Sequence, residues 1–267
     1  MKEKDLKNTI CLLCKNNKFE KISLRVRDSK KHKIIQCKQC QHIQLNPIPT
    51  LKEDEEFYDK NLQMKNIQYS QNINELKKIT KNDTQRRIQF LTKIISKDGK
   101  ILEIGSGHGF FLESIRERGY DITGIEISKE KNELAKKVTN AKILDVNINE
   151  KIPSIGKFDF IVMFHVLEHI IDPTKFLSKI KKLLKTNGKI IIEVPNVNDF
   201  QLSTNSEYKK FYWQRAHIHY FNPLSLKKVI KNNSLKVRIV GVQRYSIENM
   251  FNWKLTKKPQ MNTPTFS

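Results

Sequence analysis

The sequence predicts an α/β protein with a doubly wound, mostly parallel sheet and a small N-terminal zinc-ribbon unit. Between residues 98 and 242, short apolar runs alternate with amphipathic helical stretches, which is typical of βαβ units. All four cysteines lie in the first 50 residues, as two C-x-x-C pairs. A glycine-rich turn follows the first strand of the alternating region, and ligands of such sheets bind at the carboxyl ends of the strands.

Composition changes along the chain divide it into four predicted parts. Cysteines end where "NPIPT" begins, and a polar stretch with helical period follows, its best amphipathic segment being "ELKKITKNDTQRRIQFLTKII". The predicted parts are a zinc ribbon (1–50), a helical linker or cap (51–95), a cofactor-binding α/β domain (96–245) and a tail (246–267).

Each element of the alternating region follows from its pattern. Ser128 is a predicted N-cap, while Asp172 and Pro173 open a helix that Gly188 closes. The predicted strands are "KILEI" (100–104), "DITGIEI" (121–127), "AKILDV" (141–146), "FDFIVMF" (158–164), "KIIIEV" (189–194) and "SLKVRIVGV" (234–242). The predicted helices are "FFLESIRERG" (110–119), "SKEKNELAKKVT" (128–139), "DPTKFLSKIKKLLKTNG" (172–188) and "PLSLKKVIKNN" (223–233).

The glycine turn indicates the ligand. Gly105, Gly107 and Gly109 let the backbone turn sharply and approach a ligand closely. Glu126 ends the second strand, where an acid can accept hydrogen bonds from ribose hydroxyls. The pattern is G-x-G-x-G and not the dinucleotide fingerprint G-x-G-x-x-G, and Glu103 just before it disfavours phosphate but suits a cationic amino group. An adenosine-type cofactor with a cationic group is therefore expected.

Three segments, "LEIGSGHGFFLESI", "GIEIS" and "FDFIVMFHVLEHIIDP", resemble the class I S-adenosylmethionine-dependent methyltransferases. The resemblance covers roughly residues 90–242. It implies that the glycine loop wraps the methionine end of the cofactor near Glu103, and that Glu126 binds the ribose. Asp145 is expected at the adenine, although a strand-ending turn residue would look the same. The implied cofactor-binding set is Glu103, Gly105, Ser106, Gly107, Gly109, Glu126, Asp145, Phe164 and His165.

Histidines supply the candidate catalytic groups. A hydroxyl acceptor must lose a proton, and His suits that task near neutral pH. His169 is the first candidate base, with His217 or His219 assisting, although all three could be packing residues. His217 and His219 lie in "FYWQRAHIHYFNP", whose aromatic side chains could bind a sugar face and whose Arg215 could bind a phosphate or carboxylate.

The cysteines predict a metal. Cys11, Cys14, Cys37 and Cys40 have the spacing of a tetrahedral thiolate site of zinc-ribbon type. Since all four positions would be filled by protein, the expected zinc is structural and not catalytic. The segment "CKQCQHIQLNPIPTLKEDEEFY" resembles the lead-in of bacterial methyltransferases linked to sugar or surface-polysaccharide modification.

Net charge and hydropathy bound the partners and the location. The formal charge is +22, but most of the 50 basic residues are lysines spread along the chain, which favours solvated faces over a nucleic-acid surface. No apolar run approaches the ~20 residues of a membrane span, and no signal-peptide pattern opens the chain, so a cytoplasmic location is expected.

The expected function is methyl transfer from S-adenosylmethionine to a small-molecule acceptor, most plausibly a hydroxyl of a sugar or surface-polysaccharide precursor. An RNA methyltransferase and a non-catalytic binding protein on a truncated methyltransferase fold are the alternatives. The family's sheet has seven strands and the sequence suggests six, so either a short strand lies near residues 243–255 or the chain stops early. Early termination is the expectation, with weak cofactor binding or a partner that completes the sheet as its consequence.

Overall fold

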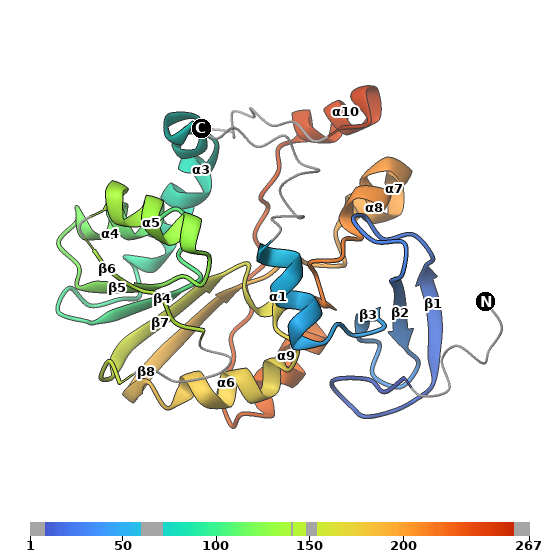
Figure 1. The fold of residues 1–267 in the computed structure, drawn as a ribbon, viewed down its shortest axis with the longest axis horizontal. Helices are drawn as coiled ribbons and strands as arrows, with labels where there is room; N and C mark the ends of the chain where they lie inside the picture. The colour runs from blue at the N-terminus through green and yellow to red at the C-terminus, as the bar shows by residue number, and fades with distance from the viewer. Residues whose placement is uncertain (1–8, 60–71, 140, 148–153, 259–267) are drawn as a thin grey trace. The chain divides into compact units, whose positions relative to one another are not determined.

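The computed structural model describes residues 9–59, 72–139, 141–147 and 154–258. The chain forms two compact units that interleave in the sequence. Unit 1 consists of residues 1–68, 168–174 and 195–267, and unit 2 of residues 69–167 and 175–194. Each predicted domain is one continuous stretch of the chain, whereas each of these units is made of separate stretches. Figure 1 shows the elements of both units.

Unit 2 contains a parallel sheet, as predicted. Its order among the described residues is β6-β5-β4-β7-β8 (Figure 1). The central strand β4 is buried along its whole length. Parallel neighbours buried on both faces favour near-continuous apolar runs, which "FIVM" provides and "ILEI" provides apart from Glu103. The elements are α3 (Ile73–Leu91), β4 (Ile101–Ile104), α4 (Phe110–Arg116), β5 (Ile122–Ile125), α5 (Lys129–Val138), β6 (Lys142–Leu144), β7 (Phe158–Phe164), α6 (Pro173–Lys181, mostly in this unit) and β8 (Leu184–Glu193).

The register places the ends of the central strands together. Ile101 of β4 lies opposite Ile122 of β5 and Phe160 of β7, so the residues that follow these strands emerge at one edge of the sheet. Helices α4 and α5 contact β5 and β6, and a buried apolar cluster that includes Leu112 and Ile115 fills the space between. The prediction of a Rossmann-like sheet is confirmed.

Two predicted elements of the alternating region are wrong. The helix that begins at Pro173 ends at Lys181 and not at Gly188, because β8 already pairs with β7 from Leu184 onward. The predicted strand 234–242 is irregular and largely exposed, with Val240 at 50% and Val242 at 51% exposure. A strand needs a neighbour for its backbone hydrogen bonds, and no described strand pairs with this segment.

Unit 1 is built on an antiparallel sheet of order β1-β2-β3-β9. Strand β9 comes from the histidine-rich segment 211–223, which has no strand period in the sequence, and joins the cysteine ribbon through pairing with β3. The elements are β1 (Phe19–Ser23), β2 (Lys33–Cys37), β3 (Ile43–Asn46), α1 (Leu51–Asp59), a 3-10 turn at Leu167–His169, α7 (Phe200–Thr204), α8 (Ser206–Tyr212), β9 (His219–Tyr220), α9 (Pro223–Lys231) and α10 (Ile247–Thr256).

Aromatic side chains form much of the core of unit 1. Tyr208, Trp213, Tyr220 and Trp253 belong to one buried cluster, and Trp213 meets Tyr220 with ring centroids 4.8 Å apart. The aromatic residues of segment 211–223 therefore serve mainly as packing groups and not as an open sugar-binding face.

The C-terminal region differs from one sequence expectation. Near residues 243–255, where a short strand is one of the two alternatives, the chain forms helix α10, which Ser246 caps. The last part of the predicted tail, 259–267, lies outside the described residues. Within the described ranges, no helix has both the length and the apolar character needed to cross a membrane.

Candidate functional site

The glycine turn of unit 2 joins β4 to α4 in a conformation that needs glycine. Gly105, Gly107 and Gly109 have φ of 74°, 55° and 79°, all in the left-handed region. A Cβ on Gly109 would lie 3.0 Å from Cβ of Ala135, whereas one on Gly107 would meet nothing within 4 Å. The turn is thus packed from behind at Gly109 and open at Gly107, where a ligand can approach the backbone.

Glu126 fastens this turn to the end of β5. Its Oε2 accepts a hydrogen bond of 2.7 Å from the amide of Gly107, and its Oε1 accepts one of 2.9 Å from the amide of Ser128. Each carboxylate oxygen can accept more than one hydrogen bond. The two ribose hydroxyls of an adenosine-type cofactor therefore fit the remaining acceptor positions.

Glu103 lies on β4 and is only 3% exposed. Its Oε2 has no hydrogen-bond partner among the described residues. Burial raises the pKa of its carboxyl to about 8, although the positive charge of Arg87 acts in the opposite direction. A buried carboxyl group without a partner is costly unless a ligand pairs with it. The ammonium group of S-adenosylmethionine has the required charge, so the residues present fit this cofactor.

The end of β7 carries a backbone outlier. His165 has φ of 56°, which a non-glycine residue adopts rarely and mostly where the surroundings enforce it. Its Nε2 lies 3.2 Å from Oε1 of Glu193, and its amide donates to the carbonyl oxygen of Glu193. Beside it, the ring of Phe164 packs edge-on against Phe111 at 5.0 Å.

Two arginines of α3, which are not among the predicted site residues, complete this region. Arg86 and Arg87 each donate to the carboxylate of Glu193, and the Arg87 guanidinium lies 4.4 Å from the ring centroid of Phe164. Burial alone would raise the pKa of Glu193, but hydrogen bonds from His165, Arg87 and Arg86 hold it well below its usual range. The signal in the sequence was the adjacent pair "RR" on the amphipathic helix that precedes the first strand.

Asp145 directly follows β6 and is exposed. This position at the carboxyl end of a parallel strand is compatible with a cofactor contact and equally with a turn residue. Its role at the adenine stays a prediction.

In unit 1 the structure brings His169 and His217 together. Their ring centroids are 5.0 Å apart, and Nδ1 of His169 lies 2.8 Å from the carbonyl oxygen of Ala216. A carbonyl can only accept, so this Nδ1 carries hydrogen, and a neutral His169 has an unprotonated Nε2. Glu168 is buried next to it, with Oε1 3.9 Å from His169 Nε2. This arrangement leaves Nε2 as a proton acceptor beside a carboxylate.

His219 has a different environment. It is 1% exposed, and its two ring nitrogens face Nε2 of His42 at 2.9 Å and the carbonyl oxygen of Ile171 at 3.3 Å. Burial lowers its pKa to about 4. With both nitrogens engaged inside the protein, His219 is suited to holding structure and not to exchanging protons with an acceptor.

Arg215 is engaged inside unit 1. Its guanidinium donates to Oδ1 of Asp54 at 2.6 Å and to the carbonyl oxygen of Glu53 at 3.1 Å, and only 4% of the residue is exposed. The expectation that Arg215 binds a phosphate or carboxylate of the acceptor is therefore wrong, because an internal carboxylate already occupies it.

The four cysteines of the ribbon fit a zinc ion. Sγ of Cys11 lies 3.5 Å from Sγ of Cys40, as does Sγ of Cys14 from that of Cys37, and all four sulfur atoms lie within 4.8 Å of one another. Sulfur atoms of a tetrahedral zinc site, with Zn–S of about 2.3 Å, are ~3.8 Å apart, whereas a disulfide requires ~2.05 Å. The set could therefore bind a structural zinc.

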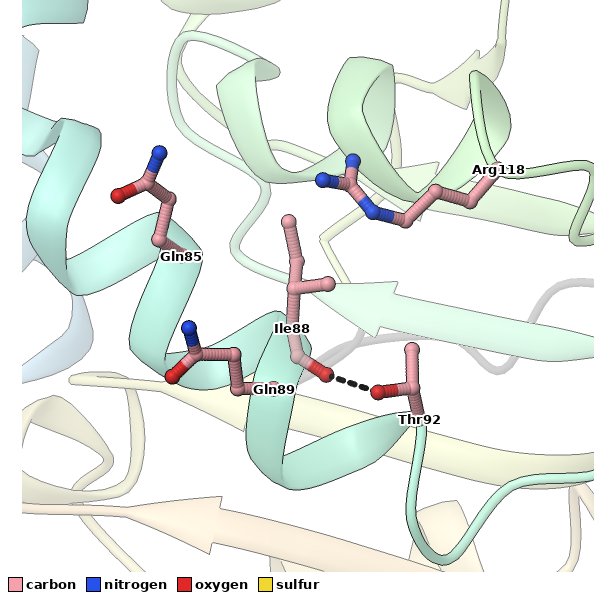
Figure 2. Close-up of a pocket in the computed structure, with 5 residues that line it drawn as sticks. All are labelled: Gln85, Ile88, Gln89, Thr92 and Arg118. Atoms are coloured by element: carbon pink, nitrogen blue, oxygen red, sulfur yellow. Dashed lines mark hydrogen bonds between the residues drawn. The ribbon is translucent and has the colours of Figure 1, made fainter.

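The structure also has two surface hollows, one in each unit. The hollow in unit 2 has a volume of about 320 Å³, and the hollow in unit 1 a volume of about 490 Å³. Figure 2 shows the residues that line the hollow in unit 2. None of the predicted site residues lines either hollow. The first is lined by Gln85, Ile88, Gln89, Thr92 and Arg118. The second is lined by Ile22, Ile43, Val197, Asn198, Asp199, Phe200, Leu202, Ser203, Lys209 and Trp213.

Known proteins share this sequence pattern. Residues 76–238 match the model of a family described as a methyltransferase domain, which is more than half of the chain. A ubiquinone biosynthesis O-methyltransferase of Dechloromonas aromatica (strain RCB) is 31% identical over 121 residues, 42% of this chain and 51% of the relative. Its counterpart in Pelagibacter ubique (strain HTCC1062) is 28% identical over 178 residues, 62% of this chain and 73% of the relative. The chain spans about half the length of the first curated relatives it matches.

Solved structures share the fold. Magnesium protoporphyrin IX methyltransferase (ChlM) from Synechocystis PCC 6803, with bound SAH, has a TM-score of 0.55 at 12% identity, over 72% of this chain and 92% of that one. The plantazolicin methyltransferase BpumL has a TM-score of 0.50 at 18% identity, over 67% and 72%. The sheet order, the glycine turn with its two buried acids and the family match agree, and the chain therefore belongs to the methyltransferase-domain family as a class I S-adenosylmethionine-dependent member.

Proposed function

We propose that this protein transfers a methyl group from S-adenosylmethionine to a hydroxyl group of a small-molecule acceptor. The observation that carries the proposal is the pair of buried carboxyl groups at the glycine turn. Oε2 of Glu103 has no hydrogen-bond partner in the described part of the chain, and Glu126 retains acceptor capacity, which matches a cofactor with one ammonium and two ribose hydroxyls. S-adenosylmethionine, when bound, supplies an electrophilic methyl group.

The residues of unit 2 have binding roles in this proposal. Glu103 pairs with the ammonium group and Glu126 with the ribose, while the open side of Gly107 admits the cofactor to the backbone. Phe164 and His165, at the end of β7, line the cofactor, and the Arg86–Arg87 pair, engaged by Glu193, fixes the helix α3 beside this strand end. Asp145 is proposed at the adenine.

His169 is the proposed general base. Its Nδ1–H is fixed on the carbonyl of Ala216, so its Nε2 can accept the proton of the acceptor hydroxyl. Glu168 would stabilise the imidazolium that forms, and His217 packs against the ring and limits its rotation. His219 is assigned a supporting role.

Two acceptor classes are consistent with a hydroxyl. The ribbon resembles that of sugar-modifying enzymes, which favours a sugar or surface-polysaccharide precursor. The relatives' printed name indicates O-methylation in ubiquinone biosynthesis, which favours an aromatic precursor. We keep the sugar hydroxyl as the first candidate, and zinc as the structural metal of the ribbon.

The cofactor site is tested by calorimetric titration with S-adenosylhomocysteine. Micromolar binding is expected for the unaltered protein, with a loss of about 100-fold in Glu126→Ala, since two charge-assisted hydrogen bonds disappear. Glu133→Gln, an exposed acid on the adjacent helix α5, is the matched control and should bind normally. A folded, zinc-loaded protein that binds no S-adenosylhomocysteine would favour the non-catalytic alternative.

The base is tested in a methyl-transfer assay against nucleotide sugars, phenolic acceptors and RNA. His169→Asn keeps a donor for the carbonyl of Ala216 and removes Nε2. We expect kcat to fall by about 10²–10⁴-fold with cofactor affinity unchanged. An Asn variant that retains full kcat would remove His169 from the mechanism.

A second candidate role of this cluster is metal binding. One ligand atom each from Glu168, His169 and His217 lies within 4.8 Å of the others. A metal ion there would occupy His169 Nε2 and act on the acceptor oxygen as a Lewis acid in place of a base. Metal analysis of the purified protein separates the two roles. One zinc ion per chain supports His169 as a general base, whereas a second metal ion that is lost in His217→Ala supports a metal site in this cluster.

A further inference from the structure

A buried pair of histidines connects the cysteine ribbon to the segment that carries the proposed base. His42 lies two positions after Cys40 and directly before β3, and it is fully buried. Its Nε2 lies 2.9 Å from Nδ1 of His219 in β9. All of these residues belong to unit 1.

The partners of the pair determine where the hydrogens lie. Nε2 of His219 faces the carbonyl oxygen of Ile171, which can only accept, so this nitrogen carries the hydrogen. A charged ring is unfavourable in a site closed to water, so Nδ1 of His219 is an acceptor and Nε2 of His42 is the donor. Nδ1 of His42 has no partner among the described residues, which suits an unprotonated nitrogen better than a buried N–H.

The segment that receives this hydrogen bond includes Glu168 and His169. The amide of Ile218 donates to the carbonyl oxygen of Glu168 at 2.9 Å, and Nδ1 of His169 contacts the carbonyl of Ala216. Together with the bond from His219 to Ile171, three hydrogen bonds hold residues 168–171 along residues 216–219.

The ribbon in turn holds the second of these segments. The amide of Leu45 in β3 donates to the carbonyl oxygen of Ile218 at 2.9 Å, and Gln44 lies opposite His219 in the register of β3 and β9. His42 supplies the donor for Nδ1 of His219, while the carbonyl of Ile171 accepts from Nε2 of the same ring. Without that donor, Nδ1 of His219 is a buried acceptor that lacks its hydrogen bond, and the ring is held less firmly against Ile171.

We propose that His42 is a positioning residue: through His219 it fixes the segment Glu168–Ile171 and thereby the direction of His169 Nε2. The part that concerns His169 as a base rests on the proposed function. The part that concerns His219 and Ile171 does not, and the experiments below keep the two apart.

The first experiment is nitrogen-15 NMR of the histidine rings in the full-length protein. The expected result is a neutral His219 with hydrogen on Nε2 and none on Nδ1, and a neutral His42 with hydrogen on Nε2. Hydrogen on Nδ1 of His219 overturns the proposal, and no variant has to fold for this outcome to count.

The second experiment compares His42→Leu, which removes the donor, with His42→Gln, which keeps an amide donor near the position of Nε2. In the Leu variant we expect about tenfold faster hydrogen exchange at the amide of Ile218, because a buried acceptor loses its donor and the segment opens more often. We also expect kcat of the Leu variant to fall about tenfold, with KM and S-adenosylhomocysteine affinity unchanged. The Gln variant should restore most of kcat and most of the slow exchange at Ile218.

A matched control is His32→Gln, another buried histidine of the ribbon, whose ring bonds to Ser29 and which should leave the exchange of Ile218 unchanged. A zinc-loaded His42→Leu protein with normal exchange and normal kcat overturns the proposal. If the unaltered protein transfers no methyl group to any acceptor, the tautomer and exchange results still decide the role of His42, and only the proposed function fails.

Discussion

At the scale of single residues, two acids beside the glycine turn, one on β4 and one after β5, have different surroundings. Glu126 accepts hydrogen bonds from two backbone amides. Glu103 is buried on β4 without such partners for Oε2, and burial raises its pKa to about 8. The protein thus has one acid that backbone amides hold in place and one, Glu103, that a cationic ligand would help to ionise.

Glu103→Gln should therefore weaken cofactor binding and strengthen the fold. The unaltered carboxyl has a pKa of about 8 when folded, against 4.5 for an ordinary Glu, so between these pH values the folded state binds more protons than the unfolded state. Stability consequently falls as pH rises from 4.5 to 8, and Gln removes this loss. We expect the variant to be more stable at pH 8 by on the order of 2 kcal/mol, and equal at pH 4, by urea unfolding.

Cofactor affinity provides the second measurement on this residue. For the unaltered protein, the affinity for S-adenosylhomocysteine should rise from pH 6 to about pH 8, as Glu103 becomes easier to ionise. The Gln variant should show a flat and weaker profile. Equal affinity of both proteins at pH 8 would mean that Glu103 does not meet the ammonium group.

At the scale of elements, the glycine turn separates packing from binding. Gly109 is backed by Ala135 and Thr139, 3.0 and 3.2 Å from an added Cβ, whereas the corresponding space at Gly107 is open. Both residues are left-handed, so either substitution adds backbone strain.

Alanine at Gly109 should mainly lower stability, whereas alanine at Gly107 should mainly lower cofactor affinity. Gly109→Ala is expected to lower the free energy of unfolding by about 2–3 kcal/mol, since strain and crowding add. Gly107→Ala should cost about 1–2 kcal/mol, yet lower S-adenosylhomocysteine affinity by about tenfold or more, because the methyl group occupies the ligand's path. Denaturation and calorimetry on both variants measure the contrast. Normal affinity of a folded Gly107→Ala protein would place the cofactor elsewhere.

The ribbon repeats one local design at its two cysteine pairs. The amide of Lys15 donates to the carbonyl of Cys11, and that of Gln41 to the carbonyl of Cys37, each at 2.9 Å. Lys15 and Gln41 are both left-handed, with φ of 63° and 59°. Each turn presents its two sulfur atoms on one side, which is how two short motifs assemble a four-sulfur site.

At the scale of the whole molecule, the two units have separate apolar cores, and the sequence supplies a probe for one of them. The protein has two tryptophans, Trp213 and Trp253, and both lie in the core of unit 1. The glycine turn, Glu103 and Glu126 belong to unit 2. Tryptophan fluorescence therefore reports on unit 1, and cofactor binding reports on unit 2.

Removing zinc with a chelator should consequently affect only one signal. We expect tryptophan emission to shift to longer wavelength as the core of unit 1 loosens, while S-adenosylhomocysteine affinity stays within about twofold. Adding zinc back should restore the emission, and Cys14→Ser with Cys40→Ser should reproduce the chelated state. Parallel loss of both signals would show that the units do not open independently.

The net charge of +22 bears on the RNA alternative. Lysine-rich faces should bind RNA weakly and without sequence preference, with affinity falling by about 10³-fold or more between 50 and 200 mM salt, as counterion release requires. Tight binding at the higher salt concentration, together with methyl transfer to RNA, would displace the small-molecule proposal. The cytoplasmic location stays a prediction.

The sequence by itself determined the parallel sheet, the cofactor class and the ribbon, because each depends on local patterns. Apolar runs with a following glycine turn define β4, and C-x-x-C spacing brings sulfur atoms together wherever the chain runs. It also indicated Glu126 from its position at a strand end, and it made His169 a candidate base because histidine exchanges protons near neutral pH.

Only the tertiary structure decided what depends on contacts between distant segments. Residues 234–242 have a strand's pattern but find no described neighbour, whereas His219 and Tyr220 lack that pattern and become β9 because β3 offers a free edge. The sequence around Arg215 suggests an anion-binding residue, but Asp54, far away in the sequence, occupies its guanidinium. Pairing partners, and the proton positions that follow from them, are properties of three-dimensional neighbours that no local pattern records.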